Sequence, residues 1–318
     1  MVVGDNQFCP LSPANATCNH FTAPIQISEY NVDTPGANVV QSIALPSLSI
    51  SANDFYLGQM QLCADGSCAV FAAQETAPFS NVLYPGHVNY VGGVLTRPYI
   101  NGNRVLARIT TSGTVDTSTK INAANYDGII KGVCALDSTG FWIAGNATGG
   151  KGIVHMNSSA VNTHTVVYNN AACGGGSCYT GCHARANTLY LVRTQGSYAY
   201  VDTPNPPIGQ NLMAPFTVTQ NPFFNGGPFY GRELISNAAG NMFWLTEPYL
   251  GQIYRGAGPT VSNGMVAIAT ATGVRGIALS RDETRLFFCL QKTINWIPAT
   301  GGAVTVLQTI TAPALEFR

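Results

Sequence analysis

Four basic residues recur near the starts of similar segments of the chain. Lys131, Arg232 and Arg275 each open an apolar segment, and His183 stands close to the equivalent place in a fourth. If these segments are repeated strands around a channel, the four side chains converge at one mouth of that channel. They would then bind an anion such as a carboxylate, a sulfate or an acidic sugar. The alternative is that they pair with nearby acids such as Glu233 or stay solvated at the rim.

The segments that carry these residues share a strand–turn–strand pattern. Each has an apolar strand, a turn built on Asp, Asn, Gly or Thr, and a second strand. The copies are Lys131–Ala144 (KGVCALDSTGFWIA), Gly181–Val192 (GCHARANTLYLV), Arg232–Thr246 (RELISNAAGNMFWLT) and Val274–Leu290 (VRGIALSRDETRLFFCL). The basic residues of the first and last copies are 144 residues apart, or three periods of about 48. A unit of that length with several short strands is typical of a propeller blade.

The sequence therefore predicts an all-β fold, a six-bladed β-propeller, with seven blades as the alternative. The chain of 318 residues holds between six and seven such periods. Five blades can be traced between Gly58 and Ile310, and Val82–Tyr99 is expected to be a long loop. The strands within Pro24–Leu45 would form a sixth blade, completed by residues 311–318, by the N-terminal tail or by a neighbouring subunit. We expect residues 1–22 to form a disulfide-stapled tail and residues 23–318 to form one propeller domain.

The charge of the chain excludes several kinds of partner. It has 15 basic and 15 acidic residues, so its net charge is zero and only 9% of its residues are charged. Nothing in this balance attracts nucleic acid or an anionic membrane surface. No uninterrupted apolar run is long enough to span a membrane, and the first residues lack the pattern of a signal peptide.

Nine cysteines, several closely spaced, favour an oxidising compartment, and we expect an extracellular or cell-surface location. The predicted disulfide cysteines bracket short loops: Cys9 and Cys18, Cys63 and Cys68, Cys173 and Cys178. The alternative is that these are buried thiols. Cys134 and Cys289 lie in apolar strand patterns and are expected to be small core residues.

No cofactor, metal site or catalytic residue is predicted, but two alternatives stay open. Residues 178–183 read CYTGCH, one residue longer than the covalent haem motif C-x-x-C-H, so Cys178, Cys182 and His183 form an alternative haem site. A channel calcium ion is the other alternative. Three N-x-S/T sequons are candidates for glycosylation: Asn15, Asn146 and Asn157.

Part of the chain resembles a known repeat. Asn241–Gly256 (NMFWLTEPYLGQIYRG) is similar to the YWTD-type propeller repeat, and Leu286–Leu307 (LFFCLQKTINWIPATGGAVTVL) resembles the NHL-like repeats of secreted bacterial proteins. Phe141–Gly145 (FWIAG) is a weaker copy. The resemblance implies a six-bladed propeller. It implies no particular activity, because such propellers serve as receptors, lyases, lactonases and structural modules.

The sequence predicts a secreted or surface-exposed β-propeller that acts as a binding or structural module. Its partner would be another protein or further copies of the chain, assembled by strand addition. A small anionic or carbohydrate ligand is a further candidate. The alternative function is an extracellular propeller enzyme, lactonase-like or lyase-like, that acts on a carbohydrate or a lactone.

Overall fold

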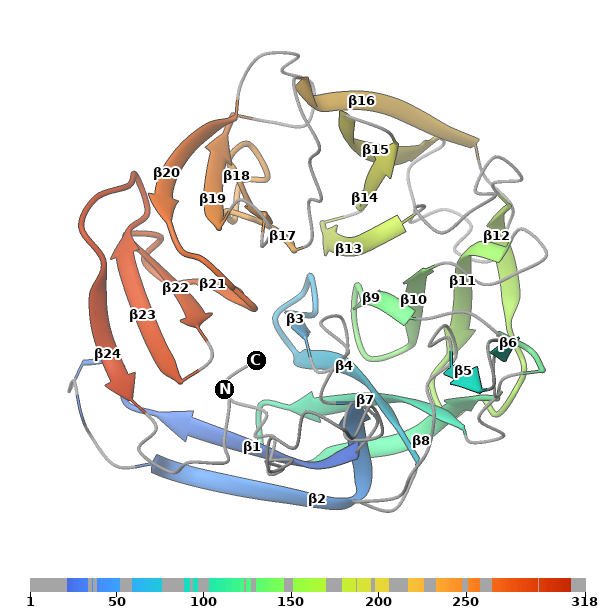
Figure 1. Ribbon diagram of the computed structural model, residues 1–318. Helices are drawn as coiled ribbons and strands as arrows, with labels where there is room; N and C mark the ends of the chain where they lie inside the picture. The colour runs from blue at the N-terminus through green and yellow to red at the C-terminus, as the bar shows by residue number, and fades with distance from the viewer. Residues whose placement is uncertain are drawn as a thin grey trace.

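The computed structural model is a ring of antiparallel β-sheets arranged around a central axis (Figure 1). The structure describes residues 22–33, 36, 39–51, 59–75, 89–91, 94–96, 103–122, 124–126, 130–145, 151–169, 179–186, 188–195, 198–205, 217–225, 233–247, 251–257, 265–290 and 292–309.

Four sheets of the ring are four-stranded blades in which consecutive strands pair. The first contains β9 (Ile130–Cys134), β10 (Gly140–Gly145), β11 (Lys151–Asn157) and β12 (Thr165–Asn169). The second contains β13 (Tyr179–Arg185), β14 (Thr188–Gln195), β15 (Tyr198–Asn205) and β16 (Thr217–Asn225). The third contains β17 (Leu234–Ser236), β18 (Phe243–Glu247), β19 (Gln252–Gly256) and β20 (Val266–Thr270). The fourth contains β21 (Ile277–Leu279), β22 (Arg285–Leu290), β23 (Thr293–Pro298) and β24 (Thr305–Thr309). The first strand of each blade lies nearest the axis in Figure 1.

The fifth sheet of the ring is six-stranded. Its strands are β1 (Thr22–Tyr30), β2 (Val39–Ser51), β3 (Met60–Leu62), β4 (Cys68–Gln74), β7 (Arg104–Thr110) and β8 (Val115–Ile121). The order is β1-β2-β4-β7-β8, and β3 pairs with β4 on the side of the axis. A separate hairpin contains β5 (Asn89–Val91) and β6 (Val94–Thr96).

The predicted all-β propeller fold is confirmed, and four of the predicted blades are four-stranded sheets at the expected places in the chain. The count of six or seven blades is not confirmed by the described residues.

Two local expectations need correction. The N-terminal strands do not form a sheet of their own, because β2 pairs with β4 through Ser49 and Gln74. Within the predicted long loop Val82–Tyr99, the β5–β6 hairpin forms because residues 89–96 can pair locally. The predicted N-terminal tail lies outside the described residues, as do residues 311–318.

The turn between the first two strands of a blade is built by a short polar side chain. The Asp137 carboxylate accepts hydrogen bonds from the backbone N–H and the hydroxyl of Thr139. Asp282 does the same for Thr284, and the Asn237 side chain accepts from the backbone of Asn241. Asp and Asn favour turns because they satisfy backbone donors that the sheet leaves unpaired. This chemistry accounts for the recurring polar residues in the repeated segments.

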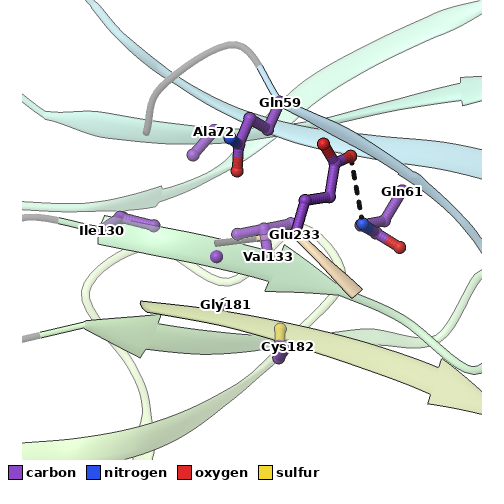
Figure 2. A pocket seen from close by; sticks show the side chains of 9 residues that line it. Gln59, Gln61, Ala72, Ile130, Val133, Gly181, Cys182 and Glu233 are labelled. Carbon is purple, nitrogen blue, oxygen red and sulfur yellow. Dashed lines mark hydrogen bonds between the residues drawn. The ribbon is translucent and has the colours of Figure 1, made fainter. Parts of the chain in front are cut away.

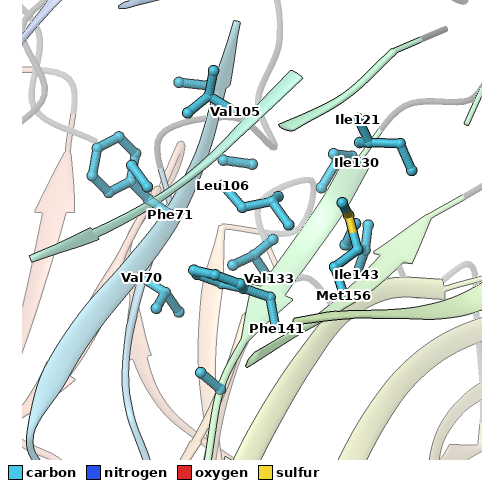
Figure 3. Packing of buried hydrophobic residues seen from close by; sticks show 14 of the residues in the cluster. Val70, Phe71, Val105, Leu106, Ile121, Ile130, Val133, Phe141, Ile143 and Met156 are labelled. Atoms are coloured by element: carbon cyan, nitrogen blue, oxygen red, sulfur yellow. The ribbon is translucent and has the colours of Figure 1, made fainter. Parts of the chain in front are cut away.

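Apolar side chains fill the space between neighbouring sheets. Figure 3 shows Phe71 and Leu106 of the six-stranded sheet packed with Val133 and Phe141 of the β9–β12 blade. Trp142, on the adjacent position of β10, packs instead toward the β13–β16 blade. Because successive residues of a strand face opposite sides, each blade contributes to two cores. That is why the second strands read as runs of large apolar residues rather than as an alternation.

Hydrogen bonds also join neighbouring sheets of the ring. They include Arg108 Nη1 to Ser158 Oγ (2.8 Å), Arg185 Nη2 to Ala238 O (2.9 Å), Trp244 Nε1 to Ala299 O (2.9 Å) and Gly36 N to Leu307 O (2.9 Å). The last of these closes the ring, because it joins the β1–β2 turn to the outermost strand of the last blade.

One close approach near the axis makes a direct prediction. A Cβ atom on Gly132 of β9 would lie 2.7 Å from the backbone N of Cys182 and 2.7 Å from Cα of Gly181, both in β13. We expect Gly132→Ala to lower the free energy of unfolding by more than about 3 kcal/mol, because two backbones must move apart. Chemical denaturation measures this loss.

Gly66→Ala is the matched control for this prediction. Gly66 has a positive φ of 75°, and a Cβ added there would meet nothing within 4 Å. Only the backbone strain remains there, and it costs about 1–2 kcal/mol. Equal losses in the two variants would show that β9 and β13 do not approach as described.

Candidate functional site

The inner strands of the five sheets meet at the axis of the ring. β9 contacts β3 and β13, and β17 contacts β13 and β21. These strands are short, and they carry polar side chains that are buried by the neighbouring sheets. Gln61, His183 and Glu233 are each less than 10% exposed. A buried polar side chain needs a hydrogen-bond partner, because an unsatisfied one costs free energy comparable to several apolar contacts.

Four polar side chains at the axis form one chain of hydrogen bonds. The Ser236 hydroxyl lies 3.0 Å from His183 Nε2, and His183 Nδ1 lies 3.2 Å from Gln61 Oε1. Gln61 Nε2 in turn donates to Glu233 Oε1 at 3.4 Å (Figure 2). The chain joins β17, β13 and β3, so residues from three different sheets depend on one another.

The direction of the chain assigns the proton of the imidazole ring. Gln61 donates to Glu233 through its amide nitrogen, so its oxygen is free to accept the Nδ1–H of His183. Nε2 then accepts the hydroxyl proton of Ser236. Burial and, to a smaller extent, the nearby positive charge of Arg185 together lower the pKa of His183 to about 3. The ring is therefore neutral at physiological pH.

The Glu233 carboxylate at the end of this chain is fixed from a second side. Its Oε2 accepts the backbone N–H of Ile277 at 3.1 Å, at the start of β21. The backbone N–H of Glu233 donates to Thr246 Oγ1 at 3.1 Å. The carboxylate is thus held rigidly between the third and fourth blades, next to the axis.

Glu233 lines two cavities. The smaller, shown in Figure 2, has a volume of about 10 Å³, which suits about one water molecule. The larger has a volume of about 230 Å³ and lies against the last blade. Apart from Glu233, its lining is mostly apolar: Met60, Leu62, Ala69, Gly276, Ile277, Ala278, Phe287, Phe288, Cys289 and Ile294. A small molecule with an apolar body could lie there with one polar group against the carboxylate.

Three of the four basic residues predicted to line the channel lie in or beside the inner strands. Lys131, His183 and Arg275 are all buried, and Arg232 lies outside the described residues. His183 belongs to the hydrogen-bonded chain and contributes as a neutral ring. Lys131 and Arg275 both have interaction partners within the protein. The idea that the four residues bind an anion together stays a prediction.

The cysteine predictions can be followed at five positions. Cys63 and Cys68 form a disulfide, with Cα atoms 5.2 Å apart. Cys134, Cys182 and Cys289 are buried free thiols. The other predicted disulfide cysteines, Cys9, Cys18, Cys173 and Cys178, lie outside the described residues.

The structure describes only some of the residues predicted for haem attachment and glycosylation. The haem alternative stays untested because Cys178 is not described, while both ring nitrogens of His183 already contact Gln61 and Ser236. Asn157 is exposed at the end of β11, whereas the sequons at Asn15 and Asn146 lie outside the described part. Among the described residues, no group of three His, Cys, Asp or Glu side chains is placed to hold a metal ion.

Two residues of the site were missed by sequence reasoning. Gln61 precedes the CADGSC loop and reads as an ordinary outward-facing polar residue of a strand. Ser236 stands between the second apolar residue of β17 and its turn. Their role depends on which sheets become neighbours across the axis, because Gln61 and His183 are 122 residues apart. The repeat pattern gave no signal for that contact.

Comparison with known proteins supports the fold. A periplasmic gluconolactonase of Pseudomonas aeruginosa, PpgL, matches 98% of this chain and 82% of its own, with 12% identity and a TM-score of 0.53. TolB from Acinetobacter baumannii matches 99% of this chain and 64% of its own, with 11% identity and a TM-score of 0.55. A nidogen/laminin complex matches 64% of this chain and 76% of its own at 10% identity, and its TM-score of 0.45 is too low to carry an argument.

These likenesses show a shared β-propeller fold and no shared activity, because the identities are low. No protein-family profile and no curated protein sequence matches the chain. Within the described residues there is also no helix of the length and apolarity needed to cross a membrane.

The neutral state of His183 predicts a dependence of stability on pH. The unfolded chain binds a proton at His183 near pH 6.5, whereas burial lowers the pKa in the fold to about 3. The resulting stability is fully present above about pH 6.5 and is lost as the pH falls toward 3. We expect His183→Gln to reduce the slope of unfolding free energy against pH, between pH 6 and 4, by roughly 1 kcal/mol per pH unit.

His155→Gln serves as the matched comparison. Burial lowers the pKa of His155 to about 4, so its removal should reduce the slope over the upper part of the same range. Denaturation curves at several pH values measure both effects. Parallel pH profiles for the wild-type protein and His183→Gln would contradict the neutral, buried ring.

Proposed function

We propose that the chain is a β-propeller binding module that works outside the cell or in the cell envelope. The Cys63–Cys68 disulfide and the small number of charged residues support that location. A periplasmic protein among the solved structures of the same fold is consistent with it. The six-bladed architecture remains part of the proposal, with the β1–β2 hairpin as the element that completes the ring.

The observation that carries a binding role is the position of Glu233. Its carboxylate lines both cavities while Gln61 and Ile277 hold it from two sides. A charged group that is fixed before a ligand arrives binds with little further cost in side-chain entropy. A buried carboxylate beside an apolar cavity also favours one orientation of the bound ligand.

The lining of the larger cavity suggests the chemistry of the ligand. Its walls are mostly apolar, and Glu233 supplies the charge on them. We propose a small ligand with an apolar body and a cationic or hydrogen-bond-donating group that meets Glu233. The anionic ligand predicted from the sequence is the competing candidate. It would require Arg275, whose neighbour Gly276 lines the same cavity.

Self-assembly by strand addition stays a prediction outside this proposal. It depends on an unpaired edge at the N-terminal strands. In the structure, β2 pairs with β4, and Gly36 in the β1–β2 turn donates to Leu307 O of the last blade. Both ends of the hairpin are therefore bonded to the chain's own sheets.

An enzymatic role for the Ser236–His183 pair is not favoured by the low pKa of the histidine. The Ser236 hydroxyl and His183 have the spacing of a nucleophile and a base. A base with a pKa of about 3, however, removes few protons at neutral pH. The polar chain is better explained as the support that orients Glu233.

A pair of probes of similar shape and opposite charge tests the proposed ligand class. We expect phenethylamine to bind, and phenylacetate to bind at least tenfold more weakly, in ligand-observed NMR or calorimetry. Glu233→Gln should weaken phenethylamine binding by at least tenfold, because the charge is lost while the side-chain shape is kept. Ala278→Phe, at the cavity wall, should block both probes by filling the space.

The control is Glu247→Gln. Glu247 is a buried carboxylate in β18 that lines neither cavity, so phenethylamine affinity should be unchanged. Tighter binding of phenylacetate, abolished by Arg275→Gln, would overturn the cationic assignment in favour of an anion. Failure of both probes to bind would contradict a ligand site of this chemistry.

A further inference from the structure

Two buried cysteines face each other across neighbouring blades. Gly132 and Cys134 lie two residues apart in β9, so their side-chain positions point to the same side of the strand. The Cβ position of Gly132 lies against the backbone of Gly181 and Cys182. Cys134 therefore faces β13 as well, two residues from the close approach at Gly132.

The two thiols lie close enough to affect one another, because the neighbouring Cys182 thiol is, after burial, a cause of the raised pKa of Cys134. Cys182 Sγ also lies 3.8 Å from the carbonyl oxygen of Trp142, the residue that pairs with Cys134 in the β9–β10 ladder. Both residues belong to one apolar cluster between the two blades and are 0% and 3% exposed. The third free thiol of the described residues, Cys289, lies in β22 of the last blade.

We propose that Cys134 and Cys182 form a disulfide that links the inner strands of two neighbouring blades when the protein folds under oxidising conditions. The pair is reduced in this structure. In the reaction, the two thiols transfer two electrons and two protons to a disulfide such as oxidised glutathione. One sulfur–sulfur bond forms in the protein, and the glutathione disulfide is cleaved to two thiols. This proposal does not depend on the proposed ligand.

Because both thiols are buried in the folded protein, the stage of folding decides whether the disulfide can form. Disulfide exchange requires a thiolate that a partner can reach. Burial and the neighbouring thiol raise the pKa of Cys134 well above its usual range, and neither sulfur is exposed in the fold. The bond therefore forms before the two blades close on each other. Once the reduced protein has folded, it is protected from oxidation.

The position of the bond suggests what it does. It would close a loop from 134 to 182, which is one repeat of the propeller, and it would join β9 to β13 where their backbones already touch. A cross-link of this span restricts the unfolded chain and so opposes separation of the blades. A covalent bond would then hold the two blades together at the inner end of their interface.

Refolding in glutathione buffers tests the proposal. The full chain is denatured and reduced, then refolded with oxidised glutathione, quenched with N-ethylmaleimide in denaturant, digested and analysed by mass spectrometry. We expect a cross-linked peptide pair that contains Cys134 and Cys182 as the major product for these residues. Cys289→Ala is the control, because it removes a buried free thiol outside the pair and should leave the product unchanged.

Two other results of the refolding experiment would overturn the proposed disulfide. N-ethylmaleimide on both Cys134 and Cys182 after oxidative refolding, or linkage of Cys134 to a cysteine other than Cys182, would overturn the proposal. A second arm adds oxidised glutathione to protein that has already folded in the reduced state. We expect the bond to form at least tenfold more slowly there than during refolding, and equal rates would overturn the protection by burial.

Discussion

The inner strands of this propeller have to meet at an axis that leaves little room for side chains, and most other features follow from that constraint. Where β9 meets β13, a glycine lets the two backbones touch. Where polar side chains reach the axis, they are buried and must bond to one another. The chain from Ser236 through His183 and Gln61 to Glu233 is the result. The sheets that contain β3, β13 and β17 therefore rely on one another's side chains for their innermost contacts.

This dependence connects stability to the proposed function. Glu233 lies at the end of the chain and beside the larger cavity, so the bonds that stabilise the axis also orient the group offered to a ligand. A neutral His183 suits this role, because a charged ring would have to be desolvated in the same space. The thiols of Cys134 in β9 and Cys182 in β13 lie beside the close approach at Gly132, where the proposed covalent bond would join the two strands.

The sequence predicted local features of the repeat better than features of the axis. The polar turn residues Asp137 and Asp282, the second strands and the Cys63–Cys68 bond follow from short-range chemistry, and the structure has each of them. Of the basic residues in register, Lys131, His183 and Arg275 lie in or beside the inner strands, but the repeat gave no sign of Gln61 or Ser236. Those contacts depend on which sheets face each other, and short-range patterns carry no information about that. The attachment of β2 to β4 was missed for the same reason.

Through its two ring nitrogens, His183 joins three sheets into one cooperative unit at the axis. A double-mutant cycle with Gln61→Leu and Ser236→Ala tests it directly, because these two residues contact different nitrogens of the same ring. Unfolding free energies of the four proteins give the coupling between the two positions. We expect the double variant to lose at least about 0.5 kcal/mol less stability than the sum of the two single losses. Strict additivity would contradict it, because Gln61 and Ser236 would then contribute independently.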